Sequence, residues 1–391
     1  MSLVKVSIVV PIYNLEKYIP RCLDALVNQT LEDIEIICVN DGSKDSAPEI
    51  IEDYKKRYPN KVKTFHKENG GEWSARTYGL KQATGEYVGF IDSDDIPEVT
   101  WAEKLYNAAK ANDADIAFCG YDRVDLETGK TVATEMTQYG TMNKEVDWND
   151  DFIVYANPSL WNKIYKLEKV KHLEFLPFRG CNDTLFLIHS YMDGVKKLTF
   201  IPDVLYHYYL RSSSQIHSLN SRDIENLKKY LLVTKEHSIK IGKYDEYKDT
   251  LASMAFLHLA ISWAFMLSYD KSVKMNEALK DIIKYLTENF PEWKNCKHYK
   301  ISHCFPKGFK FICIWGVHFF YKIHLPIVYI WVNRFLMDIV KLEVKWWLMK
   351  FKKFRVPCRR AWVLQTVRHS KFFNSLKIKC WRKNYETYWK I

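Results

Sequence analysis

The chain of 391 residues lacks the cysteine patterns of disulfide-bonded and zinc-binding proteins. Its nine cysteines are an odd number, with no C-x-x-C pair and no spacing typical of zinc ligands. Thiols without such a pattern are typical of proteins in a reducing compartment. The first residues also lack the charged, apolar and small-residue regions of a secretion signal, since a strand-like stretch begins at Val6. We therefore expect a cytoplasmic protein with reduced cysteines.

Internal repeats and low-complexity tracts are absent, and apolar runs are short. The longest run, Leu251–Ser268, has 18 residues, whereas a transmembrane helix needs about 20. Its serines and His258 make insertion into a bilayer less favourable. We expect a buried or interfacial helix here, and a membrane span is the alternative.

Acidic residues are scarce in the last 91 positions. Residues 301–391 contain 19 Lys or Arg and only three acids, Asp338, Glu343 and Glu386. The net charge of this tail is therefore +16, against a formal charge of +11 for the whole chain, which leaves about −5 for the first 300 residues. The basic character of the protein belongs to its tail.

Apolar residues of this tail recur every three or four positions, which predicts an amphipathic helix with basic flanks. The apolar positions are Trp331, Phe335, Ile339, Leu342, Trp346 and Met349, and the basic ones are Arg334, Lys341, Lys345 and Lys352. Such a helix can lie in the headgroup layer of an anionic membrane. Packing against its own domain is the alternative. We expect peripheral attachment to the inner face of the cell membrane.

The first third of the chain alternates short β-branched runs with helical patterns, which predicts βαβ units. Strands are predicted at Val6–Ile12, Ile34–Asn40, Val62–His66, Tyr87–Asp92 and Ile116–Tyr121, and helices at Tyr18–Asn28, Ala47–Arg57, Ser74–Ala83 and Thr100–Asn112. Residues 125–150 read as a loop or hairpin. Residues 152–217 mix short helices with strands near Val195–Phe200 and Leu205–Leu210, and the pattern after Arg222 is helical.

Three carboxylates directly follow the fourth predicted strand. The Asp92–Asp95 run, Asp-Ser-Asp-Asp, ends the apolar stretch Tyr87–Ile91. Carboxylates this close repel one another unless water or a cation screens them, and open α/β sheets bind ligands at the carboxyl ends of their strands. Hard oxygen ligands suit Mg²⁺ or Mn²⁺, which usually bind together with substrate phosphates. A solvated acidic turn that caps the helix near Thr100 is the alternative.

Two other predicted strands end in residues that suit a nucleobase. Pro11 should stop the first strand from continuing as a paired central strand and expose Tyr13, whose ring can lie against a planar base. Asp41 follows the second strand on a Gly-containing turn, where its carboxylate can accept the imide N–H of a uracil. A capping turn for the helix Ala47–Arg57 is the alternative for Asp41.

A Gly-rich loop, residues 68–74, opens the third predicted helix and places Arg76 in its first turn. Backbone amides at a helix start favour anions, so we expect the loop to stabilise a nearby diphosphate. The spacing does not match G-x-x-x-x-G-K-[ST], which argues against a P-loop nucleotide hydrolase.

The order and spacing of four segments resemble the family-2 inverting glycosyltransferases of bacterial surface polysaccharides. The segments are Val6–Tyr13, Asn40–Ser43, Asn69–Arg76 and Asp92–Asp95. The resemblance is strong over residues 5–120 and weaker over 150–217. It implies an α/β fold of the GT-A type, a Rossmann-like mixed sheet flanked by helices, that binds a nucleotide-diphosphate sugar, usually uridine-linked, with Mn²⁺ or Mg²⁺. Asn40 departs from the family, which more often has a second acid there.

The resemblance also implies roles for individual residues of this half. The implied nucleobase and donor contacts are Pro11, Tyr13, Asp41, Arg76, Asp92 and Ser93. The implied metal ligands are Asp94 foremost, with Asp92 and Asp95 beside it.

Farther along, Cys181–Phe186 resembles the segment in which the family carries Glu-Asp before a helix, with the Asp as catalytic base. Asp183 keeps this place, whereas Asn182 replaces the Glu and changes the charge beside the base. Without the resemblance, Asp183 reads as a cap of the helix Thr184–Met192.

Two more segments are similar to the same family. Ser159–Tyr165 contains its Trp-Asn-Lys acceptor-side motif, and Tyr206–His217 resembles the closing segment that folds over the pyrophosphate. Arg211 is the implied phosphate clamp, since its planar fork matches phosphate oxygens. His217 is a candidate for the metal shell, and a structural histidine is the alternative.

We expect a catalytic domain at 1–220, with a nucleotide-sugar half (1–121) and an acceptor half (122–220), then a helical extension (221–300) and the basic aromatic tail (301–391). The expected activity is metal-dependent, inverting transfer from a UDP-sugar to a hydroxyl of a saccharide or lipid-linked acceptor in cell-surface polysaccharide synthesis. A non-catalytic nucleotide-sugar-binding protein is one alternative, for which Asn182 is the hint. A nucleic-acid-binding protein is another, since basic residues among aromatics also suit stacked bases, but the acidic first 300 residues oppose it.

Overall fold

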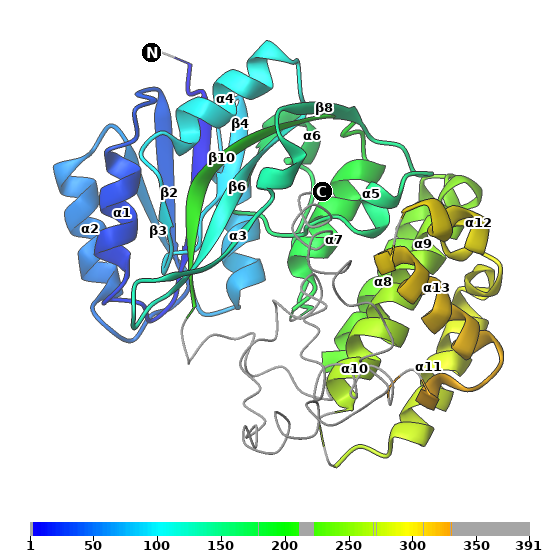
Figure 1. Cartoon of the computed structure of the whole chain (residues 1–391). Coiled ribbons are helices and arrows are strands. Elements are labelled where there is room, and N and C mark those ends of the chain that lie inside the picture. Colours follow the sequence, from blue (N-terminus) through cyan, green and yellow to red (C-terminus); the bar gives the residue numbers. More distant parts are fainter. Residues whose placement is uncertain are drawn as a thin grey trace, which may run out of the picture. The chain divides into compact units, whose positions relative to one another are not determined.

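The computed structural model describes residues 3–178, 180–210, 223–268, 270, 272–307, 309–328 and 330 (Figure 1). It divides into two compact units, the first made of residues up to 214 with 225–247, and the second of 215–224 and the residues from 248 onward. Arg211, His217 and the predicted helical face Trp331–Met349 lie outside the described residues.

The first unit is built on a mixed sheet in the order β3-β2-β1-β4-β9-β6-β10-β5, with β7 added to β6 and β8 to β10. The strands are β1 Val6–Ile12, β2 Ile34–Asn40, β3 Val62–His66, β4 Tyr87–Phe90, β5 Ile96–Pro97, β6 Ile116–Asp125, β7 Thr131–Glu135, β8 Met142–Glu145, β9 Lys163–Lys166 and β10 Lys197–Leu210. Strands β1 to β4 are parallel, and β9 runs antiparallel between β4 and β6. Every residue of β1 and β2 is buried, as expected for strands covered on both faces.

Helices cover both faces of this sheet. The helices of the first unit are α1 Ile19–Val27, α2 Ala47–Arg57, α3 Glu72–Gln82, α4 Trp101–Ala111, α5 Asp151–Val154, α6 Leu167–Val170, α7 Asn182–Met192 and, from Glu225 onward, α8 Asp223–Lys240. Gly89 and Phe90 point to opposite faces of β4. Trp101 of α4 lies against Gly89, whereas Phe186 of α7 packs on the ring of Phe90 at 5.5 Å. Figure 1 shows α1 and α2 side by side, joined by a hydrogen bond from the Tyr54 hydroxyl to the carbonyl of Pro20.

The predicted mixed α/β fold is confirmed, and its first three strands have the predicted bounds. Strand β4 ends two residues early, at Phe90, which releases Asp92 from the ladder. The two strands predicted near the end of the acceptor half are one strand, β10, whose pairing with β6 shifts register between Phe200 and Tyr206. An irregularity of this kind interrupts the apolar alternation without ending the strand.

The expectation that Pro11 ends strand pairing is wrong for one of its two neighbours. Pro11 is buried within β1, and pairing with β2 continues through Ile12 and Asn40. Pairing with β4 ends at Val9 and Phe90. The carbonyl of Val9 accepts a hydrogen bond from Ile91, and Pro11, two residues on, faces the same side. The missing N–H of Pro11 therefore faces β4 and leaves the β2 ladder intact.

The second unit is helical. Its elements include α9 Tyr244–Ala255, which begins in the first unit, a π-helical stretch Phe256–Trp263, α10 Ala264–Leu267, α11 Met275–Asn289, α12 Ile301–Cys304 and α13 Phe309–Lys322. Phe256 lies within 5.7 Å of the rings of Trp293, Tyr299, His318 and Tyr321. This aromatic cluster is the centre of the unit's core.

Within the described residues, the helical segment Tyr244–Leu267 is long and apolar enough to cross a membrane, and 83% of its apolar window is buried inside the structure. The Tyr321 hydroxyl donates to the carbonyl of Ala260 at 2.7 Å, inside the π-helical stretch. This burial agrees with the expected buried helix at Leu251–Ser268.

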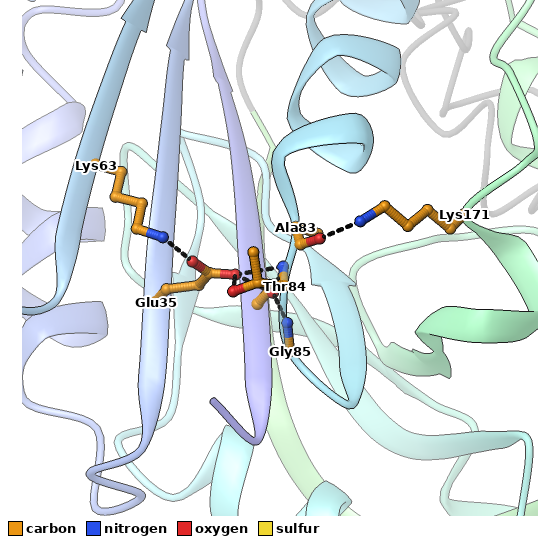
Figure 2. A network of polar contacts seen from close by, with 7 residues as sticks. Glu35, Lys63, Ala83, Thr84, Gly85 and Lys171 are labelled. Carbon is orange, nitrogen blue, oxygen red and sulfur yellow. Dashed lines mark hydrogen bonds and ion pairs between the residues drawn. The ribbon is translucent and has the colours of Figure 1, made fainter. Parts of the chain in front are cut away.

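A buried carboxylate joins three segments at the amino ends of the parallel strands (Figure 2). Glu35 of β2 accepts hydrogen bonds from Lys63 of β3 at 2.5 Å and from the backbone N–H of Thr84 at 2.7 Å. Ser7 of β1 donates to the same carboxylate and accepts from the N–H of Gly85 at 2.8 Å. A side chain at Gly85 would collide with the backbone of Ser7. The network holds the turn between α3 and β4 against β1 and β2.

This network predicts an acid-sensitive contribution to stability. Burial alone raises the pKa of Glu35, but hydrogen bonds from Lys63, Ser7 and Thr84 outweigh it and lower the pKa below its usual value. Because the folded pKa lies below the unfolded one, the contribution is complete above about pH 4.3 and is lost as the pH falls through the folded pKa. We expect Glu35→Ala to destabilise the protein by about 3 kcal/mol at pH 7, and by less at pH 3, in urea unfolding.

Glu174→Ala is the matched control, because Glu174 pairs with Lys81 on the surface with both side chains more than half exposed. It should change the free energy of unfolding by about 0.5 kcal/mol or less at either pH. Equal effects of the two substitutions at pH 7 would contradict the role of Glu35.

Candidate active site

The carboxyl ends of β1, β2 and β4 meet at one edge of the sheet, opposite the Glu35 network. Ile12 is level with Asn40 across the parallel ladder, and Val9 is level with Phe90. The residues after these ends are Tyr13, Asp41 and the Asp92–Asp95 run. Tyr13 is 46% exposed, so its ring is available to a ligand.

The side chains of the Asp92–Asp95 run alternate between the opening and the interior. Asp92 and Asp94 are half-buried, whereas Ser93 and Asp95 are buried. Both oxygens of Asp95 are engaged: Oδ2 accepts from the Tyr206 hydroxyl and Oδ1 from the N–H of Tyr209, each at 2.8 Å. Burial, with Asp94 and Asp92 nearby, raises the pKa of Asp95 well above its usual range. Asp95 therefore ties β10 to the cluster, and Asp92 and Asp94 face outward.

Arg21 of α1 binds the backbone of the Asp92–Asp95 run. Its Nη2 donates to the carbonyl of Asp94, and its guanidinium lies 4.1 Å from the centre of the Tyr209 ring. Sequence reasoning missed Arg21, because a basic residue on an amphipathic helix carries no local sign of a partner 73 positions away.

Aromatic rings form a stack beside Asp95. Trp161, from the Trp-Asn-Lys motif, lies between Tyr206 at 4.4 Å and Tyr208 at 5.5 Å, with the planes within 12° of parallel. The Tyr206 hydroxyl also accepts from the N–H of Asp92. The stack joins the start of β9 to the end of β10 and to the acidic run.

Asp41 is buried and organises the Gly-rich loop. Its Oδ1 accepts from Lys67 Nζ at 2.7 Å and from the N–H of Gly70 at 3.0 Å, and Oδ2 accepts from the N–H of Gly71 at 2.8 Å. The backbone amides of the Gly-rich loop, which we expected to stabilise a diphosphate, thus already donate to Asp41 of the same chain. Gly71 has φ +89°, a conformation that glycine adopts without strain.

Arg76 of α3 connects the two halves of the domain. Nη1 donates to Asp183 Oδ1 at 2.9 Å, and Nη2 donates to Asp92 Oδ1 at 2.8 Å and contacts Glu72. Only 3% of Arg76 is exposed. The structure therefore brings together Arg76, Asp92 and Asp183, which the sequence analysis assigned to the nucleobase pocket, the metal site and the base.

Asp183 lies in the first turn of α7, one residue after Asn182. The N-cap is Cys181, which makes no side-chain capping hydrogen bond, so the alternative of Asp183 as the cap of this helix is not what the structure shows. Oδ1 of Asn182 is buried without a hydrogen-bond partner among the described residues.

Lys163, the last residue of the Trp-Asn-Lys motif, is fully buried. Its Nζ donates to Asn162 Oδ1 at 2.7 Å and to the carbonyl of Ser159, and within the described part of the chain no carboxylate lies in ion-pair distance. Burial lowers the pKa of Lys163 to about 7, and the charge of Asp183 partly opposes this. Burial of this lysine follows from tertiary packing and has no signal in the sequence.

Comparison with known proteins points to the same family as the sequence analysis. The family model described as Glycosyl transferase family 2 matches residues 7–173. A putative glycosyltransferase EpsH of Bacillus subtilis is 31% identical over 283 residues, which are 71% of this chain and 81% of that protein. A poly(ribitol-phosphate) beta-glucosyltransferase of Bacillus spizizenii is 35% identical over 54% of this chain and 33% of its own length.

Among solved structures, the S. aureus TarS 1–349 fragment in complex with UDP-GlcNAc is similar with a TM-score of 0.62. The match has 21% identity and covers 84% of this chain and 91% of that one. It supports the GT-A fold. The extent and identity of the match to EpsH, together with the family model over the sheet described above, show that this chain belongs to glycosyl transferase family 2.

Proposed function

We propose that this glycosyltransferase moves a sugar from a UDP-sugar to a hydroxyl of a saccharide or lipid-linked acceptor, with inversion at the anomeric carbon, in cell-surface polysaccharide synthesis. The observation that carries the proposal is the bridge from Asp183 through Arg76 to Asp92. It sets a carboxylate suited to act as a base beside the acidic run at the mouth of the sheet. The UDP-GlcNAc complex of the structurally similar TarS supports a uridine-linked donor.

Asp41 and Tyr13 fit a uracil ring. An ionised carboxylate has about four lone-pair positions, and Asp41 uses three of them for Lys67, Gly70 and Gly71. One position is left for the imide N–H of uracil, while the exposed ring of Tyr13 supplies an apolar face. Pro11 lies in β1 just before Tyr13, and Ser93 lies buried beside the cluster.

The residues present fit a divalent cation. Asp94 and Asp92 offer hard carboxylate oxygens at a half-buried position, which suits Mn²⁺ or Mg²⁺. We assign Asp95 a supporting role, since both its oxygens already accept hydrogen bonds. We keep Arg211 as the phosphate clamp and His217 as a further candidate ligand. When bound, the cation neutralises the charge that develops on the departing diphosphate.

Asp183 acts as the general base in this proposal. It removes the proton of the acceptor hydroxyl as that oxygen attacks the anomeric carbon from the face opposite the nucleotide, and the bond to the diphosphate oxygen breaks. The guanidinium of Arg76 favours the charged form of this carboxylate, which is the form that a base requires. Inversion follows from this single displacement.

The donor site predicts a metal-dependent rise in thermal stability. UDP with Mn²⁺, at about 100 times its dissociation constant, should stabilise the folded protein by about 2.7 kcal/mol, read as an increase in Tm. Asp94→Ala should remove the part of the increase that depends on Mn²⁺. Asp53→Ala, on the exposed surface of α2, should keep it. An increase with guanosine diphosphate that exceeds the one with UDP would contradict the uridine assignment.

The base predicts a catalytic defect without a binding defect. Asp183→Asn should lower kcat for sugar transfer by about 10²- to 10⁴-fold, because the amide cannot accept the proton, while the Tm increase with UDP and Mn²⁺ is retained. The measurement is release of UDP in the presence of acceptor. Full activity of a folded Asp183→Asn protein would rule out this base.

We further propose that the protein works at the inner face of the membrane. The second unit exposes large apolar side chains near its last described helices, among lysines such as Lys307 and Lys322. They are Ile301, Phe305, Phe319, Ile323 and Leu325. Apolar and basic side chains on one segment match the chemistry of an anionic lipid surface, where a lipid-linked acceptor resides.

Charge reversal in the full-length chain tests this attachment. Lys345→Glu with Lys352→Glu should weaken binding to vesicles with anionic lipid in co-sedimentation, since each basic residue near the surface contributes about 1 kcal/mol. Lys56→Glu, on the exposed face of α2, should bind like the unaltered protein. Unchanged binding of the double variant would exclude the tail as the anchor.

A further inference from the structure

Arg76 is the buried residue of the site with the most charged contacts. Its guanidinium is enclosed, whereas the side chains it touches are open to solvent: Asp183 is 33% exposed, Asp92 23% and Glu72 42%. These carboxylates come from the start of α7, the end of β4 and the preceding turn of α3. The enclosed guanidinium of Arg76 therefore holds three carboxylates that are partly open to solvent.

The shape of the guanidinium makes this attachment directional. The group is planar and always charged, so its two Nη atoms hold two carboxylates in a defined relative orientation. Asp92 occupies Nη2 and Asp183 occupies Nη1. Rotation of the Asp183 carboxylate would break a charge-assisted hydrogen bond to a guanidinium that is itself enclosed.

We propose that Arg76 is the positioning residue of the general base: it orients the Asp183 carboxylate toward the donor half of the domain and keeps it ionised. This rests on the proposed function of Asp183 and is distinct from a contact between Arg76 and the nucleobase. A misplacement of about 1 Å can lower a rate by about 100-fold, so loss of the bridge should act on kcat.

Other charged or titratable groups also act on Asp183. Lys163 and Tyr165 face it from β9, and Glu72 faces it from α3. Lys163 favours the ionised carboxylate, as Arg76 does. Desolvation and the nearby carboxylates raise the pKa of Glu72 to about 7, so Glu72 is largely protonated over the acidic range in which a carboxylate titrates and has little effect on Asp183 there. Arg76 and Glu72 belong to the same helix and touch each other, so Glu72 offers a matched control for the loss of a contact beside Arg76.

The first test measures the base directly and needs no turnover. In full-length protein labelled with ¹³C at aspartate carboxyls, Asp183→Asn identifies the Asp183 signal, which is then titrated with pH by NMR. Arg76→Gln should raise the pKa of Asp183 by about one pH unit or more, the size typical of an adjacent cation, and the control Glu72→Gln should leave it nearly unchanged, because Glu72 is already protonated in that range. A general loosening of the fold would move the pKa in both variants. A pKa that is the same in Arg76→Gln and in the unaltered protein overturns the inference.

The second test separates the base from the nucleobase by kinetics. Arg76→Gln should lower kcat by about 100-fold and move the acidic limb of the kcat–pH profile to higher pH. Arg76→Lys keeps the positive charge, so the acidic limb of its kcat–pH profile should stay near that of the unaltered protein while kcat falls. This variant replaces Arg76→Gln in the test if Arg76→Gln does not fold. A rise in KM for the donor with kcat and the limb unchanged would assign Arg76 to the nucleobase and overturn the inference.

Different results would overturn the proposed function and the role of Arg76. Absence of any sugar transfer by the unaltered protein would overturn the proposed function, while the NMR titration would still decide whether Arg76 controls the ionisation of Asp183.

Discussion

A single buried guanidinium links distant segments of the first unit. Arg76 reaches Asp92 at the end of β4 and Asp183 at the start of α7, two segments that the chain separates by 91 positions. A buried cation is tolerated only when carboxylates and hydrogen bonds replace the water it has lost. The same requirement fixes both acids, so the need to satisfy one charge defines the distance between Asp92 and Asp183.

The acids at this edge of the sheet divide into buried and half-buried members. Asp41 and Asp95 are buried, and their oxygens accept hydrogen bonds from the Gly-rich loop and from β10. Asp92 and Asp94 alternate with buried neighbours and open outward. Burial selects against carboxylates without partners, so the buried members are held by hydrogen bonds, and the half-buried members are those that we propose for the cation. Glu35 performs the same structural task at the opposite end of the strands (Figure 2).

Hydrophobic periodicity is a local property, and the elements that depend on it were predictable. The bounds of β1, β2, β3 and α2 agree with those read from the sequence, because β1 and β2 are short, mostly apolar runs and α2 buries residues at helical spacing. The fold class followed from their order. Pro11 is a case that the local sequence pattern cannot decide. The neighbouring strand that loses a hydrogen bond is the one that the proline nitrogen faces, and this depends on the arrangement of the sheet.

By itself the sequence determined the fold class, the acidic run and the family resemblance, because these reside in residue types at short, fixed spacings. Only the tertiary structure decided which acids pair with which cations. Asp41 accepts from Lys67 and from amides of the Gly-rich loop, and Arg76 joins Asp183 across 107 positions. Arg21 donates to the backbone carbonyl of Asp94, and Lys163 is buried without a carboxylate in ion-pair distance among the described residues. Such partners are chosen by burial and by the geometry of packed elements, which have no counterpart in local sequence pattern.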